Sequence, residues 1–432
     1  MSITHLSEQA TAQRALEALR NGVPNGDAVN ALGCMQPEAL DRFHDQLEAL
    51  EQAQLEPTGT DRVPHPGTLI AGDFGSGKSH TLAYLEQEAL RRNFVVSKVV
   101  ISKETPLHDP SKLFAAAVRE ARLPDSRGSL LHELAIRLDY RSDRAVPFVD
   151  WATRVQPYGM LGATVMIHER SHDAELQEQI INWWSGDKLP VAVVRGGLRD
   201  LGAPKAFEVK AVKLADLAPV RFEFAARLAR AVGFAGWVLL LDEVELIGRY
   251  SLLQRARAYA ELARWLGLVS GQAIPGSTAG AAITDDFEIS VLDSRHDREK
   301  APGRLAQKGD PVSLAQASMA EAAIDVISRG PVRLHRPSDD TLQLSHDRLR
   351  ELYRTAYGVA PRAHESLADG AHRAMRNHVR RWINEWDLDR LYPDQAQDAY
   401  EEDLHLDYTE DKDLEAETET PAEGDGPGEG GW

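Results

Sequence analysis

The sequence predicts an α/β fold with a mostly parallel sheet, and three observations lead to this prediction. Short apolar runs with strand composition occur at 68–71, 94–101 and 237–241, and stretches with helical spacing separate them. A glycine-rich segment follows the first run, and a pair of acids follows the third. Strands that alternate with helices form parallel sheets, because each connecting helix packs against a face of the sheet.

The N-terminal region is predicted to be helical. Apolar side chains recur at three- and four-residue spacing within residues 6–50, and segment 22–26, rich in glycine and proline, interrupts them with a turn. A loop at 57–67 then leads to the first strand. Residues 105–230 also have mostly helical spacing, with a small strand pair expected at 191–195 and 207–212.

Beyond the third strand, we expect a strand near 280–283, a helix at 311–327 and a short strand at 331–335. Ser338 is placed to cap a further helix. Trp382 and Trp386 are four residues apart and are expected in the core of this last module. We therefore divide the chain into an N-terminal helical region (1–60), an α/β domain (61–337) with a helical insertion at about 140–215, a helical lid (338–395) and a disordered acidic tail (396–432).

Composition narrows the class of protein. Hydrophobic residues make up 43% and charged residues 27% of the 432 residues, which excludes a wholly disordered, collagen-like or membrane protein. Of the net charge of −18, −12 comes from thirteen acids and one lysine at 401–432. The net charge of the remaining residues, 1–400, therefore does not exclude a nucleic-acid partner. The single cysteine and the lack of an apolar export signal predict a cytoplasmic protein without disulfides or cysteine-based metal sites.

Segment 72–79, GDFGSGKS, fits the pattern G-x-x-x-x-G-K-[ST]. Its glycines let the backbone bend so that N–H groups point at phosphate oxygens. Lys78 places its charge on the β- and γ-phosphates, and Ser79 offers a hydroxyl to Mg²⁺. A chance glycine turn would not be expected between a strand and a helix, so we predict an ATP site. The residues predicted to bind ATP are Gly72, Asp73, Phe74, Gly75, Ser76, Gly77, Lys78, Ser79 and His80.

The acid pair after the third strand supplies the second half of such a site. Asp242 is predicted to hold Mg²⁺ together with Ser79, and Glu243 to orient or deprotonate the attacking water. A plain polar loop after a strand explains the same two acids if they are taken alone. Together with the phosphate loop they predict ATP hydrolysis rather than phosphoryl transfer to a small acceptor.

Further polar residues are weaker candidates. Thr284 ends the next strand and is predicted to contact the γ-phosphate or the attacking water, although an ordinary turn explains it nearly as well. Arg329 is a candidate to reach a neighbouring subunit's nucleotide, with surface solvation the simpler reading and Arg295 and Arg298 weaker rivals.

A basic face in the lid is a candidate for nucleotide and DNA contacts. Arg373, Arg376 and Arg380 share a helix face, and Arg381 adjoins it, so one arginine can touch the nucleotide while others face DNA phosphates. A solvated basic face is the alternative reading.

Together these motifs resemble the AAA+ and origin-recognition branch of P-loop ATPases. That resemblance makes Lys78 and Ser79 part of Walker A, Asp242 and Glu243 Walker B, Thr284 sensor 1 and Arg376 sensor 2. This resemblance is also compatible with a homo-oligomer. The segments GDFGSGKSH, SKETPL and LLLDEVE are similar to those of BrxD-type ATP-binding proteins of bacterial BREX phage-exclusion systems. This family implies ATP and Mg²⁺ as cofactors and a methyltransferase, a phosphatase-like protein and a helicase as partners.

Three functions follow as hypotheses. The first is a DNA-coupled ATPase, acting as motor or switch in a phage-defence complex. The second is a nucleotide-gated scaffold that recruits proteins with little turnover. The third is an origin-recognition-like DNA binder or helicase loader. It ranks last because it needs a winged-helix module after the lid, and the stretch of about 40 residues after Leu391 is acidic.

Overall fold

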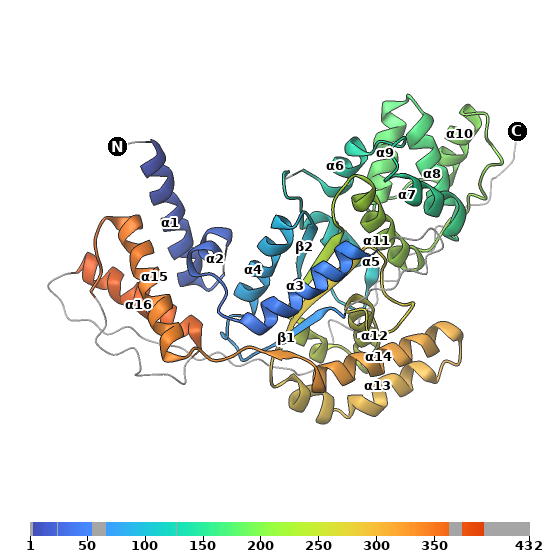
Figure 1. Cartoon of the computed structure of the whole chain (residues 1–432). Helices are drawn as coiled ribbons and strands as arrows, with labels where there is room; N and C mark the ends of the chain where they lie inside the picture. The colour runs from blue at the N-terminus through green and yellow to red at the C-terminus, as the bar shows by residue number, and fades with distance from the viewer. Residues whose placement is uncertain (1–2, 24, 54–65, 127, 363–373, 393–432) are drawn as a thin grey trace, which may run out of the picture.

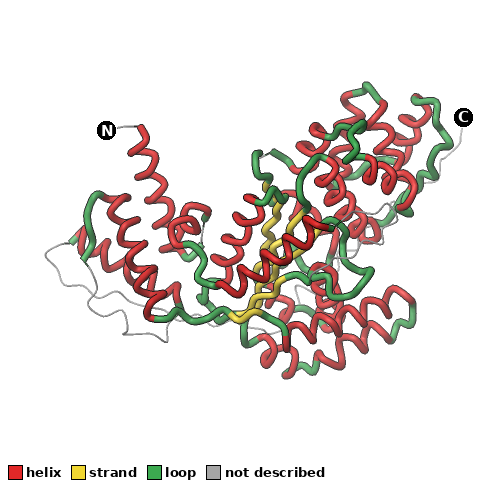
Figure 2. The backbone as a smooth tube through the Cα atoms, viewed as in Figure 1, coloured by secondary structure: helices red, strands yellow, loops and turns green. Residues whose placement is uncertain are grey.

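The computed structural model describes residues 3–23, 25–53, 66–126, 128–362 and 374–392. A six-stranded sheet lies at its centre with helices on both faces, which confirms the predicted α/β fold with a mostly parallel sheet (Figures 1 and 2). The strand order is β3-β2-β4-β5-β1-β6, and the pairing of β2 with β3 is antiparallel. The strands are β1 (Thr68–Ala71), β2 (Val95–Val100), β3 (Ala121–Arg122), β4 (Trp237–Asp242), β5 (Ser277–Ile283) and β6 (Val332–Arg333).

The register brings the ends of the central strands to one edge of the sheet. Asp242 at the end of β4 pairs with Val100 of β2, and Ala71 at the end of β1 pairs with Ile283 of β5. All six residues of β4 are buried. Because these parallel strands run in the same direction, the segments that follow β1, β4 and β5 meet at their carboxyl ends.

Alternate residues of β4 pack into two different cores, as expected for a strand covered on both faces. Val238 and Leu240 join the core formed with α3 (Pro37–Gln52) and α4 (Lys78–Arg91). Trp237 and Leu239 face the opposite core, which includes α5 (Pro110–Arg119), α11 (Leu214–Ala231) and α12 (Leu252–Trp265).

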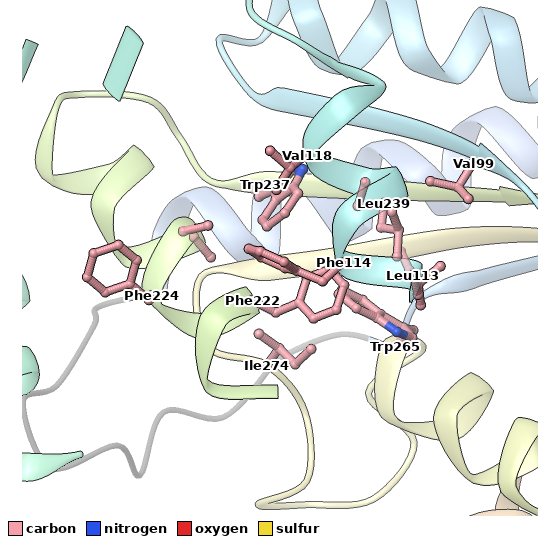
Figure 3. Packing of buried hydrophobic residues seen from close by; sticks show 14 of the residues in the cluster. Val99, Leu113, Phe114, Val118, Phe222, Phe224, Trp237, Leu239, Trp265 and Ile274 are labelled. Atoms are coloured by element: carbon pink, nitrogen blue, oxygen red, sulfur yellow. The ribbon is translucent and has the colours of Figure 1, made fainter. Parts of the chain in front are cut away.

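Aromatic rings fill the second core (Figure 3). The Phe222 ring meets Phe114 edge-on, with centroids 4.9 Å apart, and Trp265 in the same way at 4.5 Å. Edge-to-face pairs of this kind add about 0.5–1.5 kcal/mol each beyond the burial of their surface.

The chain between β3 and β4 is helical, as predicted for 140–215, but the strand pair predicted there is wrong. Residues 191–195 begin α10, and 207–212 form no strand. The valine-rich sequence favours a strand, but Pro190 directly precedes the helix, and Val194 and Leu198 bury one helical face. These helices are α6 (Leu130–Arg137), α7 (Val146–Asp150), a π-helix (Trp151–Val155), α8 (Gly159–Arg170), α9 (Ala174–Ser185) and α10 (Val191–Asp200).

The two ends of the described chain share one helical core. Figure 1 shows α1 (Ile3–Asn21) and α2 (Gly26–Leu32) beside α15 (Asp339–Tyr357) and α16 (Met375–Leu391). Leu16 and Leu19 pack in the same cluster as Tyr353, Trp382 and Trp386. We call these four helices the helical module. The burial predicted for both tryptophans is confirmed, but the sequence did not reveal that regions 1–60 and 338–395 pack together.

Three helices pack together beside the sheet, and a buried ion pair joins the first two of them. They are α12, α13 (Asp297–Ala306) and α14 (Pro311–Arg329), the last of which confirms the helix predicted at 311–327. Asp297 is fully buried and accepts bonds from Arg255 Nε at 2.7 Å and Nη2 at 2.9 Å. Tyr259 Oη donates a third bond to the same carboxylate at 2.9 Å. Such pairing is what makes a buried carboxylate tolerable.

Two predictions fall outside these findings. The acidic tail (396–432) and Arg373 lie outside the described residues.

Within the described ranges, the helices lack a stretch that is both long and apolar enough to cross a bilayer.

Candidate functional site

The glycine-rich segment after β1 forms a loop that suits an anion. Gly75 and Gly77 have φ angles of 78° and 99°, in the left-handed region that favours glycine. Gly77 directly precedes α4, which begins at Lys78. The first N–H groups of a helix lack partners within the helix, and its N-terminus carries partial positive charge. The loop can therefore surround a phosphate with N–H donors, as its spacing predicted.

Polar side chains inside this loop remain available for a ligand. Lys78 is buried, and its Nζ donates to the carbonyl oxygens of Gly72 at 2.8 Å and Asp73 at 3.3 Å. An ammonium group has three N–H donors, so one remains. Ser76 Oγ is buried and has no hydrogen-bond partner among the described residues. Both observations fit a loop built to receive phosphate oxygens.

The predicted acid pair lies next to this loop. Asp242 is buried at the end of β4, and its Oδ2 lies 3.6 Å from Nζ of Lys98 on β2. Glu243 has a φ of 59°, which is unusual for a residue with a side chain, and its N–H donates to Asp242 Oδ1 at 3.1 Å. Burial and the Asp242 charge raise the pKa of Glu243, in spite of opposing effects from Lys78 and Arg376. A raised pKa makes Glu243 a better proton acceptor near neutral pH.

The oxygen donors at this edge fit Mg²⁺ that arrives with a nucleotide. The hydroxyl of Ser79 and the carboxylate of Asp242 are hard ligands of the kind that Mg²⁺ prefers. Clusters of three or more His, Cys, Asp or Glu side chains suited to a metal are absent from the described part of the chain. Mg²⁺ commonly keeps several waters and binds substrate phosphates, so two protein ligands suffice.

A cavity of about 280 Å³ lies over the loop, between the sheet domain and the helical module. Its floor is the loop and the start of α4, with Glu243 beside them. One wall comes from α1, the end of α2 and the segment after it, and the other comes from 335–338 and helices α15 and α16. The lining residues outside the loop that bear on function are Leu19, Gly22, Gly33, Met35, Gln36, His335, Arg336 and Arg376.

Hydrogen bonds connect the two walls to each other and to the floor. Gln36 and His335 bond reciprocally, from Gln36 Nε2 to the His335 carbonyl at 3.1 Å and from the His335 N–H to Gln36 Oε1 at 3.0 Å. His80 Nε2 lies 2.8 Å from the Gly33 carbonyl oxygen. Burial lowers the pKa of His80, so the neutral ring donates this bond. Hydrogen bonds thus link α4 to the segment after α2, and that segment to His335 after β6.

Arg376 reaches the loop from the helical module. Its Nη2 donates to the Gly22 carbonyl at 2.7 Å, and its guanidinium carbon lies 5.6 Å from the centre of the Phe74 ring. The Arg376 N–H also donates to the Gly75 carbonyl at 3.3 Å. The structure therefore brings Lys78, Glu243 and Arg376 to one cavity.

Other predicted residues lie near the cavity without lining it. Thr284 directly follows β5 and is buried, and Asp242 is buried behind Glu243. Gly72 and Asp73 lie at the base of the loop, where Asp73 pairs at 3.1 Å with Arg336, in the segment that follows β6.

The remaining arginine candidates lie elsewhere. Arg329 and Arg298 are paired with acids of their own surroundings, Arg329 with Asp325 at 3.2 Å and Arg298 with Glu288 at 2.6 Å. In the basic face of α16, Arg380 is exposed and Arg381 pairs with Glu385 at 2.6 Å. Arg295 is half-buried just before α13.

Three residues of this site were not found from the sequence. Lys98 is the only charged residue in the run VVSKVV, which was a usable signal. Glu245 follows the acid pair by two positions, yet it is buried, with 1% of its surface exposed. Gly22 was assigned to a turn, and only the packing of α1 against α16 gives it a place beside Arg376.

Comparison with known proteins gives one family match. Residues 10–131 match the family described as BREX system ATP-binding protein BrxC/D. This span contains α2, α3, β1, the phosphate loop, α4 and β2, but not the acid pair or the lid. The match confirms the predicted resemblance to BREX ATP-binding proteins. Neither the curated proteins nor the solved structures include a match to this chain.

Proposed function

We propose that this chain is a P-loop ATPase that couples ATP hydrolysis to a DNA-directed step within a bacterial BREX phage-defence complex. The observation that carries the proposal is the meeting of Lys78, Glu243 and Arg376 at one cavity, although the first two are 165 positions apart in the sequence and Arg376 comes from the helical module. The strand order supports an AAA+-like arrangement, because β5 separates the strand of the acid pair from the strand of the phosphate loop.

The proposed division of labour follows from the chemistry of each side chain. Lys78 and the loop N–H groups bind the β- and γ-phosphates. Mg²⁺, held by Ser79 and Asp242, would neutralise phosphate charge. Glu243 orients the attacking water and accepts its proton.

Two further residues would act on the γ-phosphate. Arg376 stabilises the charge that develops on it, and Thr284 contacts it or the water from the end of β5. The cavity has walls on both the sheet domain and the helical module, so nucleotide can change how tightly the module packs on the loop.

The proposed partners are DNA, further copies of this chain and other BREX proteins. DNA phosphates would contact the exposed Arg380 and its neighbours on α16, and Arg329 would contribute to a homo-oligomer. A cytoplasmic location is proposed from the single cysteine. Action beside a BREX methyltransferase, phosphatase-like protein and helicase is proposed from the resemblance of residues 10–131.

A nucleotide-gated scaffold is the second candidate. The observation that favours it is the large helical region from α6 to α10, which forms no part of the cavity and offers surface for docking proteins. Such a scaffold needs ATP binding but not hydrolysis.

Two single variants separate the candidates in cells that depend on the system for phage resistance. Lys78→Ala should abolish protection under either function, because both need bound ATP. Glu243→Gln should abolish protection only if hydrolysis is required. Protection by Glu243→Gln at the wild-type level would refute the ATPase proposal and favour the scaffold, provided that immunoblotting shows equal protein levels.

A further inference from the structure

A third acid lies under the phosphate loop and is not used by the functions proposed above. Glu245 is in the short helix Val244–Arg249 that follows the acid pair. It is 1% exposed, and neither of its carboxylate oxygens receives a hydrogen bond from another described residue. A buried carboxylate without hydrogen bonds is expensive, so an ordinary structural role does not explain it.

The charges around Glu245 point to one partner. Its Oε1 lies 3.9 Å from Nζ of Lys78, a distance of ionic attraction rather than of a hydrogen bond. Glu243 and Asp242 repel it, so Lys78 is the cation that acts on it. Burial raises the pKa of Glu245 to about 7.

Lys78 has one N–H donor that the loop does not use. Two carbonyl oxygens of the loop, from Gly72 and Asp73, accept the other two. The third donor and the positive charge are what nucleotide phosphates would engage, and they are also what Glu245 attracts. Phosphate and carboxylate therefore compete for the same ammonium group.

We propose that Glu245 is a positioning residue for Lys78, whose carboxylate holds the ammonium at the base of the loop and yields it to the phosphates of an incoming nucleotide. This inference rests on the proposed nucleotide function and adds a device that limits affinity. Weak holding of nucleotide suits a protein that must release its product and bind again.

The test is the dissociation constant of a fluorescent, non-hydrolysable ATP analogue with Mg²⁺ at pH 8, where the Glu245 carboxyl is largely ionised. Coulomb attraction at 3.9 Å in a buried site is several times thermal energy, so removing it should be plain in the affinity. We expect Glu245→Gln to bind the analogue roughly tenfold more tightly than the wild type. Glu245→Asp keeps the charge but draws it away from Lys78, and it should fall between the two.

A double-mutant cycle with Lys78→Ala, measured up to analogue concentrations high enough to saturate the weakened site of this variant, shows whether the effect passes through Lys78. The gain from Glu245→Gln should vanish in the Lys78→Ala background, whereas a purely structural effect would persist there. Glu261→Gln is the matched control, because Glu261 is also a buried glutamate, on α12 and outside the cavity lining. Its affinity should equal that of the wild type.

The outcomes separate this inference from the function on which it rests. If the wild type does not bind the analogue, the proposed function fails and the inference falls with it. If the wild type binds the analogue but Glu245→Gln binds it equally or more weakly, only the inference is overturned. The same holds if Glu245→Gln increases the affinity as much in the Lys78→Ala background as in the wild type. If Glu245→Gln does not fold, tighter binding by Glu245→Asp supports the inference, and unchanged or weaker binding refutes it.

Discussion

The burial of Glu245 predicts how the stability of the protein changes with pH. Its pKa is about 7 in the folded protein against an ordinary value of 4.5. The folded state therefore binds a proton more readily than the unfolded state between these two values. Stability consequently falls as pH rises from about 4.5, and the loss is complete once pH passes 7.

The magnitude follows from the difference of 7 minus 4.5. At 1.36 kcal/mol for each pKa unit, the full loss is about 3 kcal/mol. Between pH 5.5 and 8.5 the part still to be lost is about 2 kcal/mol, because some loss has already occurred at pH 5.5. Glu245→Gln has no such proton to release, so the wild type should lose about 2 kcal/mol relative to this variant across that range.

Urea denaturation without nucleotide, followed by tryptophan fluorescence, measures this difference. Comparing two proteins at each pH cancels the titration of the groups that do not interact with Glu245, and any constant effect of the glutamine amide drops out of the pH dependence. Glu38→Gln on the surface of α3 is the control and should run parallel to the wild type. Parallel curves for the wild type and Glu245→Gln would contradict the raised pKa of Glu245, because Glu245 would then not titrate in this window.

Two further predictions concern the contacts around the site and the fold. Gly22→Ala and Gly202→Ala both force alanine into a φ of 69°, but only at Gly22 would the new Cβ collide with Arg376. Both variants should lose about 1 kcal/mol of stability. Only Gly22→Ala should also reduce ATP turnover, by roughly tenfold. Equal turnover by the two variants in steady-state assays would contradict the role of Arg376. Asp297→Asn should destabilise the protein by about 3–5 kcal/mol in urea titrations because it breaks a buried ion pair. Asp293→Asn breaks a half-exposed ion pair and should cost less than about 1 kcal/mol of stability. A similarly small loss of stability in Asp297→Asn would show that the buried pair contributes little.

The parts of the fold that could be predicted are those with a local signal. Strands β1, β2, β4 and β5 follow from short apolar runs, and the loop before α4 follows from its fixed glycine and lysine spacing. The strand expected at 191–195 was wrong because valine favours strands locally, whereas the packing of Val194 and Leu198 favours a helix.

The parts that could not be predicted depend on contacts between distant segments. Leu16 packs with Tyr353 and Trp386 across more than three hundred residues, and a single sequence has no pattern that pairs them. The same packing supplies one cavity wall and the position of Gly22. Glu245 was missed for a related reason: its burial arises from where β4 ends against the phosphate loop, not from its neighbours in sequence.

The rate of ATP hydrolysis shows whether this protein acts as a DNA-coupled ATPase. Turnover would be measured for the wild type and Glu243→Gln, with and without double-stranded DNA, over a series of salt concentrations. We expect DNA-stimulated turnover that weakens as salt rises and that falls by about 100-fold or more in Glu243→Gln. Tight ATP binding with no turnover in any condition, or equal turnover by the two proteins, would contradict this expectation.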